Sequence, residues 1–258
     1  MVRRLRSRVG SPDRGPRAFT VVGCELAVVT AHVLRGRADT VAADREASRR
    51  LLEVAAAGER AVRVWTPHRQ VAFGRRDANR DGYDRARQAA QAHDFEPVER
   101  SVGGRAVAYD GETTLAFARA EPVGDLRSGI QDRYDALADE LATALADLDV
   151  SVERGEPADA FCPGSHSLRL PDGPKVAGIA QRVTDDAALV AGILVVDGRA
   201  ELAAVLADVY AALDLSLDGE AVGSVVDGDG SAGPERVRRT VESQRVGDET
   251  PTYVHLND

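Results

Sequence analysis

Residues 175–196 read KVAGIAQRVTDDAALVAGILVV, and two apolar segments, Lys175–Val183 and Ala187–Val196, flank the polar residues 184–186. Short polar residues between apolar runs are typical of a turn, so this stretch is predicted to form two antiparallel strands joined as a hairpin. Gly178 lies inside the first strand, where a glycine marks a close approach of backbone or ligand. We therefore expect this stretch to belong to a mostly antiparallel sheet.

Helices and short strands are predicted on both sides of this hairpin in the chain. In Ile130–Leu148 apolar residues recur every three or four positions on one face, and Leu202–Leu213 repeats that pattern. A third helix begins after Thr40, an N-cap residue, and ends at Gly58, and a polar helix covers Tyr83–Ala92. Strands are predicted at Ala61–Trp65, Gln70–Gly74, Pro97–Ser101, Arg105–Tyr109, Thr114–Ala118 and Ser167–Leu170. This mixture, without a regular βαβ rhythm, indicates an α+β fold of mostly antiparallel sheets flanked by helices.

One domain is expected, over residues 36–226. Residues 1–35 are expected to be an N-terminal extension that is poorly ordered in part, because its first half is rich in Arg, Gly and Pro. The apolar stretch 19–33 is either an additional strand or part of a predicted chain start that was placed too early. Residues 227–258 form a polar tail, in which the segment from Pro234 is expected to be a loosely attached helix.

The composition excludes several classes of protein. The chain has 258 residues, of which 43% are hydrophobic and 29% charged, as in ordinary soluble proteins. It contains no apolar run close to the roughly 18 residues that a membrane-spanning helix needs. The formal net charge of −9, with no basic stripe outside the extreme N-terminus, argues against nucleic acid as a partner. Two cysteines are too few for a disulfide framework, so we expect a reducing, cytoplasmic location.

Lysine is almost absent from the chain. Lys175 is the single lysine among 33 lysine and arginine residues. Its retention suggests that a guanidinium cannot replace it, because arginine stays charged, whereas lysine can lose its proton in a dry pocket and fits a compact acceptor. The alternative is a surface lysine that survived by chance.

Residues 100–110, RSVGGRAVAYD, carry groups that are suited to binding. The pair Gly103-Gly104 lets backbone N–H groups approach a ligand closely, and Arg100 and Arg105 can meet a carboxylate or a phosphate. A plain β-turn with solvated arginines is the alternative.

Residues 161–168, FCPGSHSL, carry a candidate nucleophile. The Cys-Pro-Gly turn presents the thiol of Cys162 at the start of a strand. A thiolate at this place can act as a nucleophile if a base or a positive charge lies nearby. The alternative is a cysteine that is buried as a small apolar side chain.

Together and in this order, these segments resemble the lipoate-protein ligase and octanoyltransferase family, which shares its catalytic fold with biotin protein ligases. Residues 64–77 resemble the early strand pair of the family, which ends in a Gly-Arg or Gly-Lys element. Residues 100–110 resemble its Arg-x-x-Gly-Gly signature, and residues 175–182 its Lys-x-x-Gly-x-Ala/Ser-Gln-Arg signature. The resemblance runs over about residues 39–226 and implies a biotin/lipoate protein ligase-like catalytic domain.

The resemblance implies transfer of lipoate or octanoate to a lysine of a lipoyl domain of a 2-oxoacid dehydrogenase, or of the glycine-cleavage H protein. In the family the invariant lysine contacts the acyl carbonyl, which corresponds to Lys175, and the Gly-Gly strand borders the acyl tunnel. The substrate-binding residues so implied are Arg100, Gly103, Gly104, Arg105, Ala106, Val107 and Gly178. Two positions depart from the signature: Tyr109 replaces a histidine and Val102 replaces a small polar residue. No metal site is expected.

Cys162 decides between two kinds of enzyme. The transferase branch that this sequence resembles carries Cys-Pro-Gly-Ser ahead of the lysine strand, as residues 162–165 do here. A thioester on Cys162, formed without a cofactor, is therefore the first interpretation, and an acyl carrier protein, an H protein or a free acid would each fit as the acyl donor. We expect Lys175 beside Cys162, as ion-pair partner of the thiolate or as its base, and oxyanion donors near Gly104 and Gly178.

Two alternatives stay open. In an ATP-dependent lipoate ligase, the side chains of Arg100, Arg105 and Lys175 would stabilise an acyl-adenylate, ATP and Mg²⁺ would be required, and Cys162 would be incidental. In a non-catalytic subunit that binds lipoyl domains, the isolated chain would be inactive. Biotin ligase activity is disfavoured, because the Gly-Arg-Gly-Arg adenylate loop of that family is absent.

Overall fold

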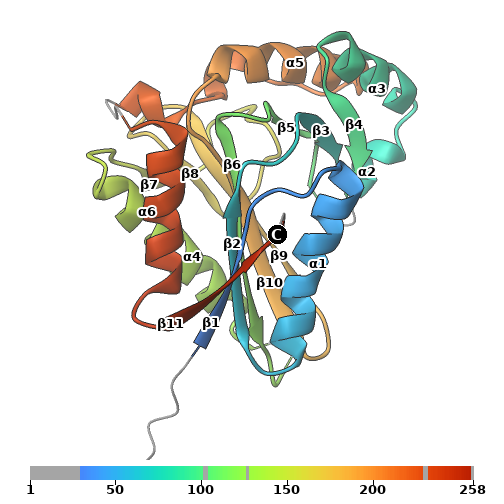
Figure 1. Cartoon of the computed structure of the whole chain (residues 1–258). Coiled ribbons are helices and arrows are strands. Elements are labelled where there is room, and N and C mark those ends of the chain that lie inside the picture. Colours follow the sequence, from blue (N-terminus) through green and yellow to red (C-terminus); the bar gives the residue numbers. More distant parts are fainter. Residues whose placement is uncertain (1–29, 101–103, 126–127, 229–231, 257–258) are drawn as a thin grey trace, which may run out of the picture.

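An eight-stranded sheet forms the centre of the structure (Figure 1). The computed structural model describes residues 30–100, 104–125, 128–228 and 232–256. Across the sheet the strands follow the order β11, β1, β2, β6, β10, β9, β8, β7. Their bounds are Thr30–Arg35 for β1, Arg60–Trp65 for β2, Thr114–Pro122 for β6, Glu153–Arg154 for β7, Ser167–Arg169 for β8, Lys175–Val183 for β9, Ala187–Val195 for β10 and Thr250–His255 for β11.

The hairpin predicted from residues 175–196 is confirmed. β9 and β10 pair antiparallel, with Gly178 opposite Ile193, and the backbone N–H of Thr184 donates to the carbonyl oxygen of Ala187 at the turn (2.8 Å). β10 also pairs antiparallel with β6 over its full length, and β6 pairs antiparallel with β2. The middle of the sheet is therefore antiparallel, as expected, whereas β1 makes parallel pairs with β2 and β11.

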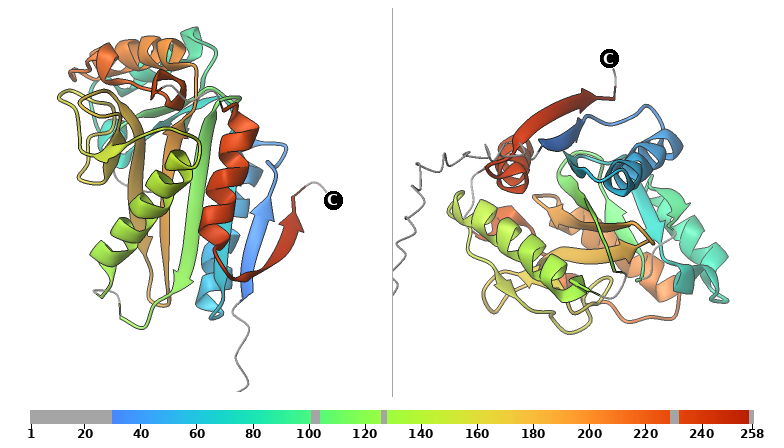
Figure 2. Two further views of the ribbon diagram at one scale, coloured as in Figure 1. Left: turned by 90° about the vertical axis from the view of Figure 1, so that its left-hand side faces the viewer. Right: turned by 90° about the horizontal axis from the view of Figure 1, so that it is seen from below.

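Helices cover both faces of this sheet (Figure 2). α4, Ile130–Ala146, and α6, Pro234–Val246, bury their apolar residues against one face in the largest core cluster. α1, Val41–Ala56, packs on the opposite face, and the Thr40 side chain accepts a hydrogen bond from the N–H of Ala43, which confirms the predicted N-cap. Within the described part of the chain, no helix combines the length and the apolar character that crossing a membrane requires.

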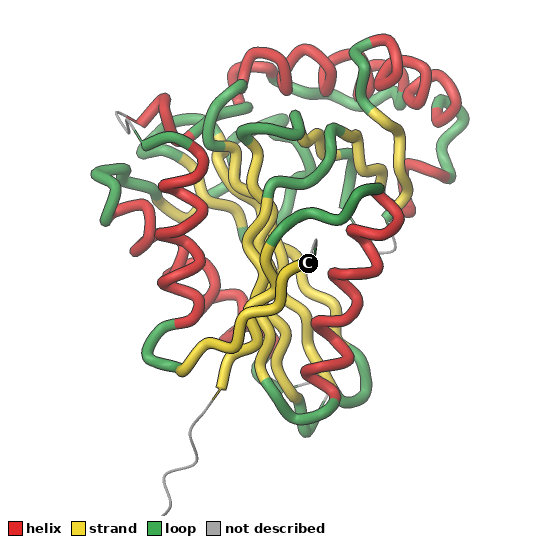
Figure 3. Tube along the Cα trace, in the orientation of Figure 1, coloured by secondary structure: helices red, strands yellow, loops and turns green. Residues whose placement is uncertain are grey.

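A second, three-stranded sheet lies with helices α3 and α5 at the top of the molecule in Figure 3. Its strand order is β4 (Glu96–Glu99), β3 (Gln70–Phe73), β5 (Val107–Tyr109). The helices are α2 (Arg75–Ala78), α3 (Tyr83–Ala92) and α5 (Arg199–Ala212), and 3-10 turns cover Gly219–Ala221 and Val225–Gly228. Apolar residues of α3 and α5 pack with β3 and β5 in a second core cluster. Both helices were expected from the sequence, and α3 has the predicted bounds.

Regular elements continue beyond residues 36–226 at both ends of the described chain. Residues 30–35, expected in the extension, form β1, because alternate apolar side chains of this segment are fully buried between the sheet and α6. Residues 1–29 lie outside the described residues. The segment after Pro234 is a helix, as expected, but it is tightly packed: Val237 and Val241 are at most 1% exposed. Burial of these side chains fixes α6 to the sheet.

Candidate active site

The candidate nucleophile, Cys162, lies in the loop before β8, where its backbone has a positive φ of 41°. Two contacts hold this conformation. The N–H of Cys162 donates to the hydroxyl of Tyr210 on α5 (2.6 Å), and that hydroxyl donates to the carbonyl oxygen of Ala106 (3.1 Å). The carbonyl oxygen of Cys162 accepts a hydrogen bond from Lys175 Nζ (3.0 Å). These contacts link the Cys162 turn to β9 of the large sheet and, through Tyr210, to Ala106 beside β5 of the small sheet.

Two N–H groups face the sulfur of Cys162. Arg100 Nη2 lies 3.2 Å from Sγ, and the backbone N–H of Arg105 donates to Sγ at 3.4 Å. The second contact depends on Gly104, whose φ is +94°, and a Cβ at this glycine would lie 2.8 Å from Sγ and 2.6 Å from Arg100 Nη2. A side chain at position 104 would therefore push into the thiol and its partner. N–H groups thus lie beside Gly104, and their role as oxyanion donors stays a prediction.

Lys175 is buried, with 1% of its surface exposed, but its ammonium does not take the predicted place on the sulfur. Nζ donates to Glu156 Oε1 (3.0 Å) and to the carbonyl oxygens of Phe161 (2.9 Å) and Cys162 (3.0 Å). An ammonium has three N–H groups, so these acceptors use all of its donors. The expected ion pair of Lys175 with the thiolate is thus corrected: the cation in contact with Sγ is Arg100.

An apolar cavity of about 300 Å³ opens beside Cys162. One row of paired residues crosses its floor, from Gly178 on β9 through Ile193 and Ala116 to Trp65 on β2. Three strand spacings separate the ends of this row, which corresponds to about 14 Å. Small side chains make the space: the floor and walls include Ala72, Ala116, Gly178, Ala180, Ala191 and Gly192. The cavity suits a narrow, apolar ligand whose polar end lies at Cys162.

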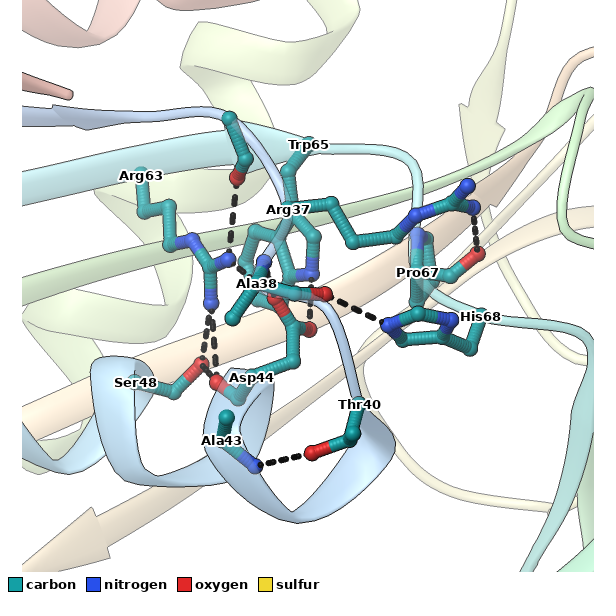
Figure 4. Close-up of polar contacts among 11 residues, drawn as sticks. Arg37, Ala38, Thr40, Ala43, Asp44, Ser48, Arg63, Trp65, Pro67 and His68 are labelled. Carbon is teal, nitrogen blue, oxygen red and sulfur yellow. Dashed lines mark hydrogen bonds and ion pairs between the residues drawn. The ribbon is translucent and has the colours of Figure 1, made fainter. Parts of the chain in front are cut away.

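Trp65, at the far end of this cavity, is fixed by a buried polar cluster between β2 and α1 (Figure 4). Its indole Nε1 donates to Asp44 Oδ2 (2.9 Å), and the guanidinium of Arg63 lies over its ring (4.1 Å to the centroid). Arg63 also donates to Asp44 and to Ser48 Oγ (2.8 Å). The orientation of the indole is therefore set by α1 and the loop before it.

Burial controls the charge of the other groups near the sulfur. It raises the pKa of Tyr109 to about 12, although Arg100 acts in the opposite direction. Burial also acts to lower the pKa of Arg100, but interactions with Cys162, Tyr109 and Asp77, among them the hydrogen bond to Cys162, outweigh this effect, so that the pKa of Arg100 lies above its ordinary value. Tyr109 is thus neutral and Arg100 positively charged at neutral pH. Among the described residues, no group of three or more His, Cys, Asp or Glu side chains is placed to hold a metal ion.

The residues predicted from sequence gather around Cys162 in two layers. Those that line the cavity are Arg100, Val107, Cys162, Lys175 and Gly178. The backbones of Gly104, Arg105 and Ala106 contact the Cys162 turn or its partners, and the Arg105 side chain points to Asp77 instead (3.8 Å). Gly103 lies outside the described residues.

Two residues of the site were not predicted. Tyr210 lies on the apolar face of α5, where a tyrosine usually finds a partner for its hydroxyl, and this was the available signal. Glu156, the ion-pair partner of Lys175, lies in a loop between β7 and β8, and nothing in its local sequence marks it. Both act through contacts with residues distant in the chain.

Comparison with known proteins places these features in a family. The model of the lipoyl protein ligase A/B catalytic domain matches residues 42–228. The chain belongs to this family. The expectation from the sequence is confirmed, and the matched segment contains Arg100, Cys162 and Lys175.

The curated proteins similar to this chain include relatives from two bacteria. A protein of Exiguobacterium sibiricum called octanoyl-[GcvH]:protein N-octanoyltransferase is 34% identical over 163 residues, which cover 62% of this chain and 57% of the relative. A protein of Listeria monocytogenes called lipoyl-[GcvH]:protein N-lipoyltransferase is 28% identical over 137 residues, 53% of this chain and 49% of the relative. The chain thus spans about half the length of the curated relatives it matches.

Solved structures share the fold. A lipoate-protein ligase A bound with ATP superposes with a TM-score of 0.68 at 16% identity, over 87% of this chain and 89% of the other. A bipartite lipoate protein ligase from Thermoplasma acidophilum, described with its E2 lipoyl domain, gives a TM-score of 0.65 at 16% identity, over 87% of each chain. The α+β, lipoate-ligase-like fold expected from the sequence is therefore confirmed.

Proposed function

We propose that this protein transfers an octanoyl or lipoyl group from the H protein GcvH to a lysine of a lipoyl domain, through a thioester on Cys162. One observation carries the proposal: Cys162 lines a mostly apolar cavity, with two N–H donors directed at its sulfur. The names of the relatives in Exiguobacterium and Listeria support the choice of GcvH as donor.

In the first step the Cys162 thiolate attacks the amide carbonyl of acylated GcvH. The S–C bond forms and the C–N bond breaks. The released lysine amine takes a proton, and we assign Lys175 Nζ as the donor of this proton. In the second step an amine of the acceptor lysine attacks the thioester, the thiolate leaves, and the proton lost by the amine returns to Lys175. The two steps balance without an oxidant or a cofactor.

The oxyanion that forms at the acyl carbonyl needs donors that are already in place. The backbone N–H of Arg105 lies 3.4 Å from Sγ and is held there by the conformation of Gly104. Such a preorganised donor stabilises charge that develops in the transition state. We assign Arg105 N–H to the oxyanion, and Arg100, Val107 and Gly178 to the walls that contact the acyl group.

The cationic side chains argue for transfer rather than for an ATP-dependent ligase. Lys175 uses its donors on Glu156 and two carbonyl oxygens, and Arg100 contacts the sulfur. The Arg105 guanidinium is directed at Asp77. In this arrangement the guanidinium groups of Arg100 and Arg105, two of the cations that an acyl-adenylate would require, are engaged elsewhere, and we keep the ligase as the alternative to be tested.

The test is the intact mass of a lipoyl-domain acceptor after incubation with the protein. One mixture contains octanoyl-GcvH without ATP, and a second contains free lipoate with MgATP. We expect acylation in the first mixture, its loss in Cys162→Ala and Lys175→Arg, and its retention in Cys24→Ala, which removes the other cysteine. Acylation only with ATP, or transfer by Cys162→Ala, would reject the thioester mechanism. No acylation in either mixture would favour the non-catalytic alternative.

A further inference from the structure

The positive charge of Arg100 lacks a carboxylate in contact with it. Within the described part of the chain, its hydrogen bonds go to the carbonyl oxygen of Arg105 (2.6 Å) and to Cys162 Sγ (3.2 Å), and its buried Nε has no partner. A buried charge is unstable unless an opposite charge or several hydrogen bonds compensate it. The only atom in contact with Arg100 that can carry a full negative charge, among the described residues, is the sulfur.

The other ionic groups around the Cys162 turn form pairs of their own. On β9 the ammonium of Lys175 faces the Glu156 carboxylate (3.0 Å). On α2 the buried carboxyl of Asp77 lies 3.8 Å from Arg105 Nη1. Each pair brings one positive and one negative group to the site, so together they add no net charge. Asp77 also acts on Arg100 at longer range and raises its pKa, but among the described residues no carboxylate contacts the Arg100 guanidinium.

The two phenols that face this site cannot supply the missing negative charge. Burial raises the pKa of Tyr109, on β5, to about 12. Burial also raises the pKa of Tyr210, on α5, and its hydroxyl donates to a carbonyl oxygen. Both side chains are neutral at neutral pH. Among the described residues, the sulfur of Cys162 is therefore the contacting group that can pair with the charge of Arg100.

We propose that Arg100 is a catalytic residue whose guanidinium holds the sulfur of Cys162 as a thiolate. A guanidinium in contact with a cysteine favours the thiolate over the thiol, and the thiolate is the form that attacks a carbonyl. The resemblance of residues 100–110 to a ligand-binding signature implies a role in substrate binding for Arg100, and its contact with Sγ gives it a different one. The backbone N–H of Arg105 assists from the other side.

The consequence for catalysis rests on the proposed function. When the thioester forms, the sulfur becomes neutral and Arg100 loses its counter-ion. When the acceptor amine attacks, the C–S bond breaks and the electron pair returns to the sulfur, where Arg100 stabilises it. One guanidinium thus favours the nucleophile in the first step and the leaving group in the second.

The ion pair is tested without substrate, by alkylation of Cys162 with iodoacetamide followed by intact mass. In a Cys24→Ala background, the rate at pH 6 is compared with the rate at pH 9 for the parent, for Arg100→Gln and for Arg100→Lys. We expect the parent to react readily at pH 6. Arg100→Gln should lower the rate at pH 6 relative to the rate at pH 9 by about tenfold or more, which is the effect of one pK unit. Arg100→Lys should restore part of this ratio.

The matched control is Arg76→Gln, which removes an exposed arginine from neighbouring α2. It keeps the parent ratio if contact, rather than distant charge, favours the thiolate. Thermal unfolding shows whether Arg100→Gln is folded, and Arg100→Lys provides the comparison if it is not. The proposal is overturned if Arg100→Gln and Arg76→Gln show the same ratio of alkylation rates at pH 6 and pH 9. A normal alkylation result without acyl transfer would reject the proposed function and leave the ion pair intact.

Discussion

The Cys162 turn concentrates unusual backbone geometry in one residue. Cys162 has a φ of +41°, which costs a residue other than glycine about 1–3 kcal/mol, and it precedes Pro163, which restricts its conformation further. Such a conformation persists only when its neighbours fix it. Here the N–H of Cys162 is held by Tyr210 and its carbonyl oxygen by Lys175. These two contacts set the direction in which the sulfur points.

Removal of the Tyr210 hydroxyl tests this account. Tyr210→Phe keeps the ring in the core but leaves the N–H of Cys162 and the carbonyl oxygen of Ala106 without their partner. We expect kcat of acyl transfer to fall about tenfold, the equivalent of one buried hydrogen bond, with KM for the donor unchanged. The control is Tyr253→Phe on β11, an exposed tyrosine. A parent-like kcat would show that the turn holds its conformation without this hydroxyl.

Between elements, a buried polar contact joins α1 to β2. Arg63 is fully buried, and burial lowers its pKa although Asp44 acts in the opposite direction. Asp44 accepts hydrogen bonds from Arg63, from the Trp65 indole and from the N–H of Ala38 (3.1 Å). The pair therefore anchors the helix that covers the cavity and also the aromatic ring at the end of the cavity.

Breaking this pair should cost much more than breaking an exposed one on the same helix. Asp44→Ala leaves the Arg63 charge buried without a partner, and we expect the free energy of unfolding to fall by about 3–5 kcal/mol in urea titrations. Glu46→Ala removes the exposed partner of Arg49 and should change it by less than about 0.5 kcal/mol. Similar losses in both variants would mean that Arg63 finds other acceptors.

Local patterns predicted the elements whose partners are close in sequence. The β9–β10 hairpin and helix Tyr83–Ala92 follow from turn residues and apolar spacing that act within a few residues. β1 and β11 could not be predicted as partners, since about 220 positions separate them and β11 is mostly exposed. Distance in the sequence also decides which parts of the candidate site could be predicted. The motifs give Cys162 and Lys175, but a contact between Arg100 and Sγ depends on how two distant loops meet.

For the whole molecule, the C-terminal segment completes the sheet. β11 pairs with β1 at the sheet edge, and α6 buries Val237, Val241 and Val246 against the sheet beneath it. Arg35 of β1 donates to the nearly buried Glu242 of α6 (3.0 Å), which adds a polar contact to the apolar ones. Both ends of the described chain therefore contribute to one layer.

Two truncations separate the contributions of α6 and β11. Removal of residues 234–258 deletes the three buried valines, whose burial contributes about 1.5 kcal/mol each, so we expect the free energy of unfolding to fall by about 5 kcal/mol. This loss is comparable to the whole stability of an ordinary domain, so the shortened chain should be largely unfolded at about 37 °C and show no cooperative thermal transition. Removal of residues 250–258 alone deletes mostly exposed residues and should leave a cooperative transition with a lower Tm. Circular dichroism melting measures both, and equal damage would contradict the role given to α6.

Under the proposed function, which acylates lysines, the scarcity of lysine in the chain itself has a consequence. Its own single ε-amino group, on Lys175, is 1% exposed and fully hydrogen-bonded. A copy of the protein that carries an activated acyl group therefore meets no lysine on the surface of another copy. Self-modification, a hazard for any enzyme whose substrate is a common surface side chain, would therefore find no exposed lysine in this chain.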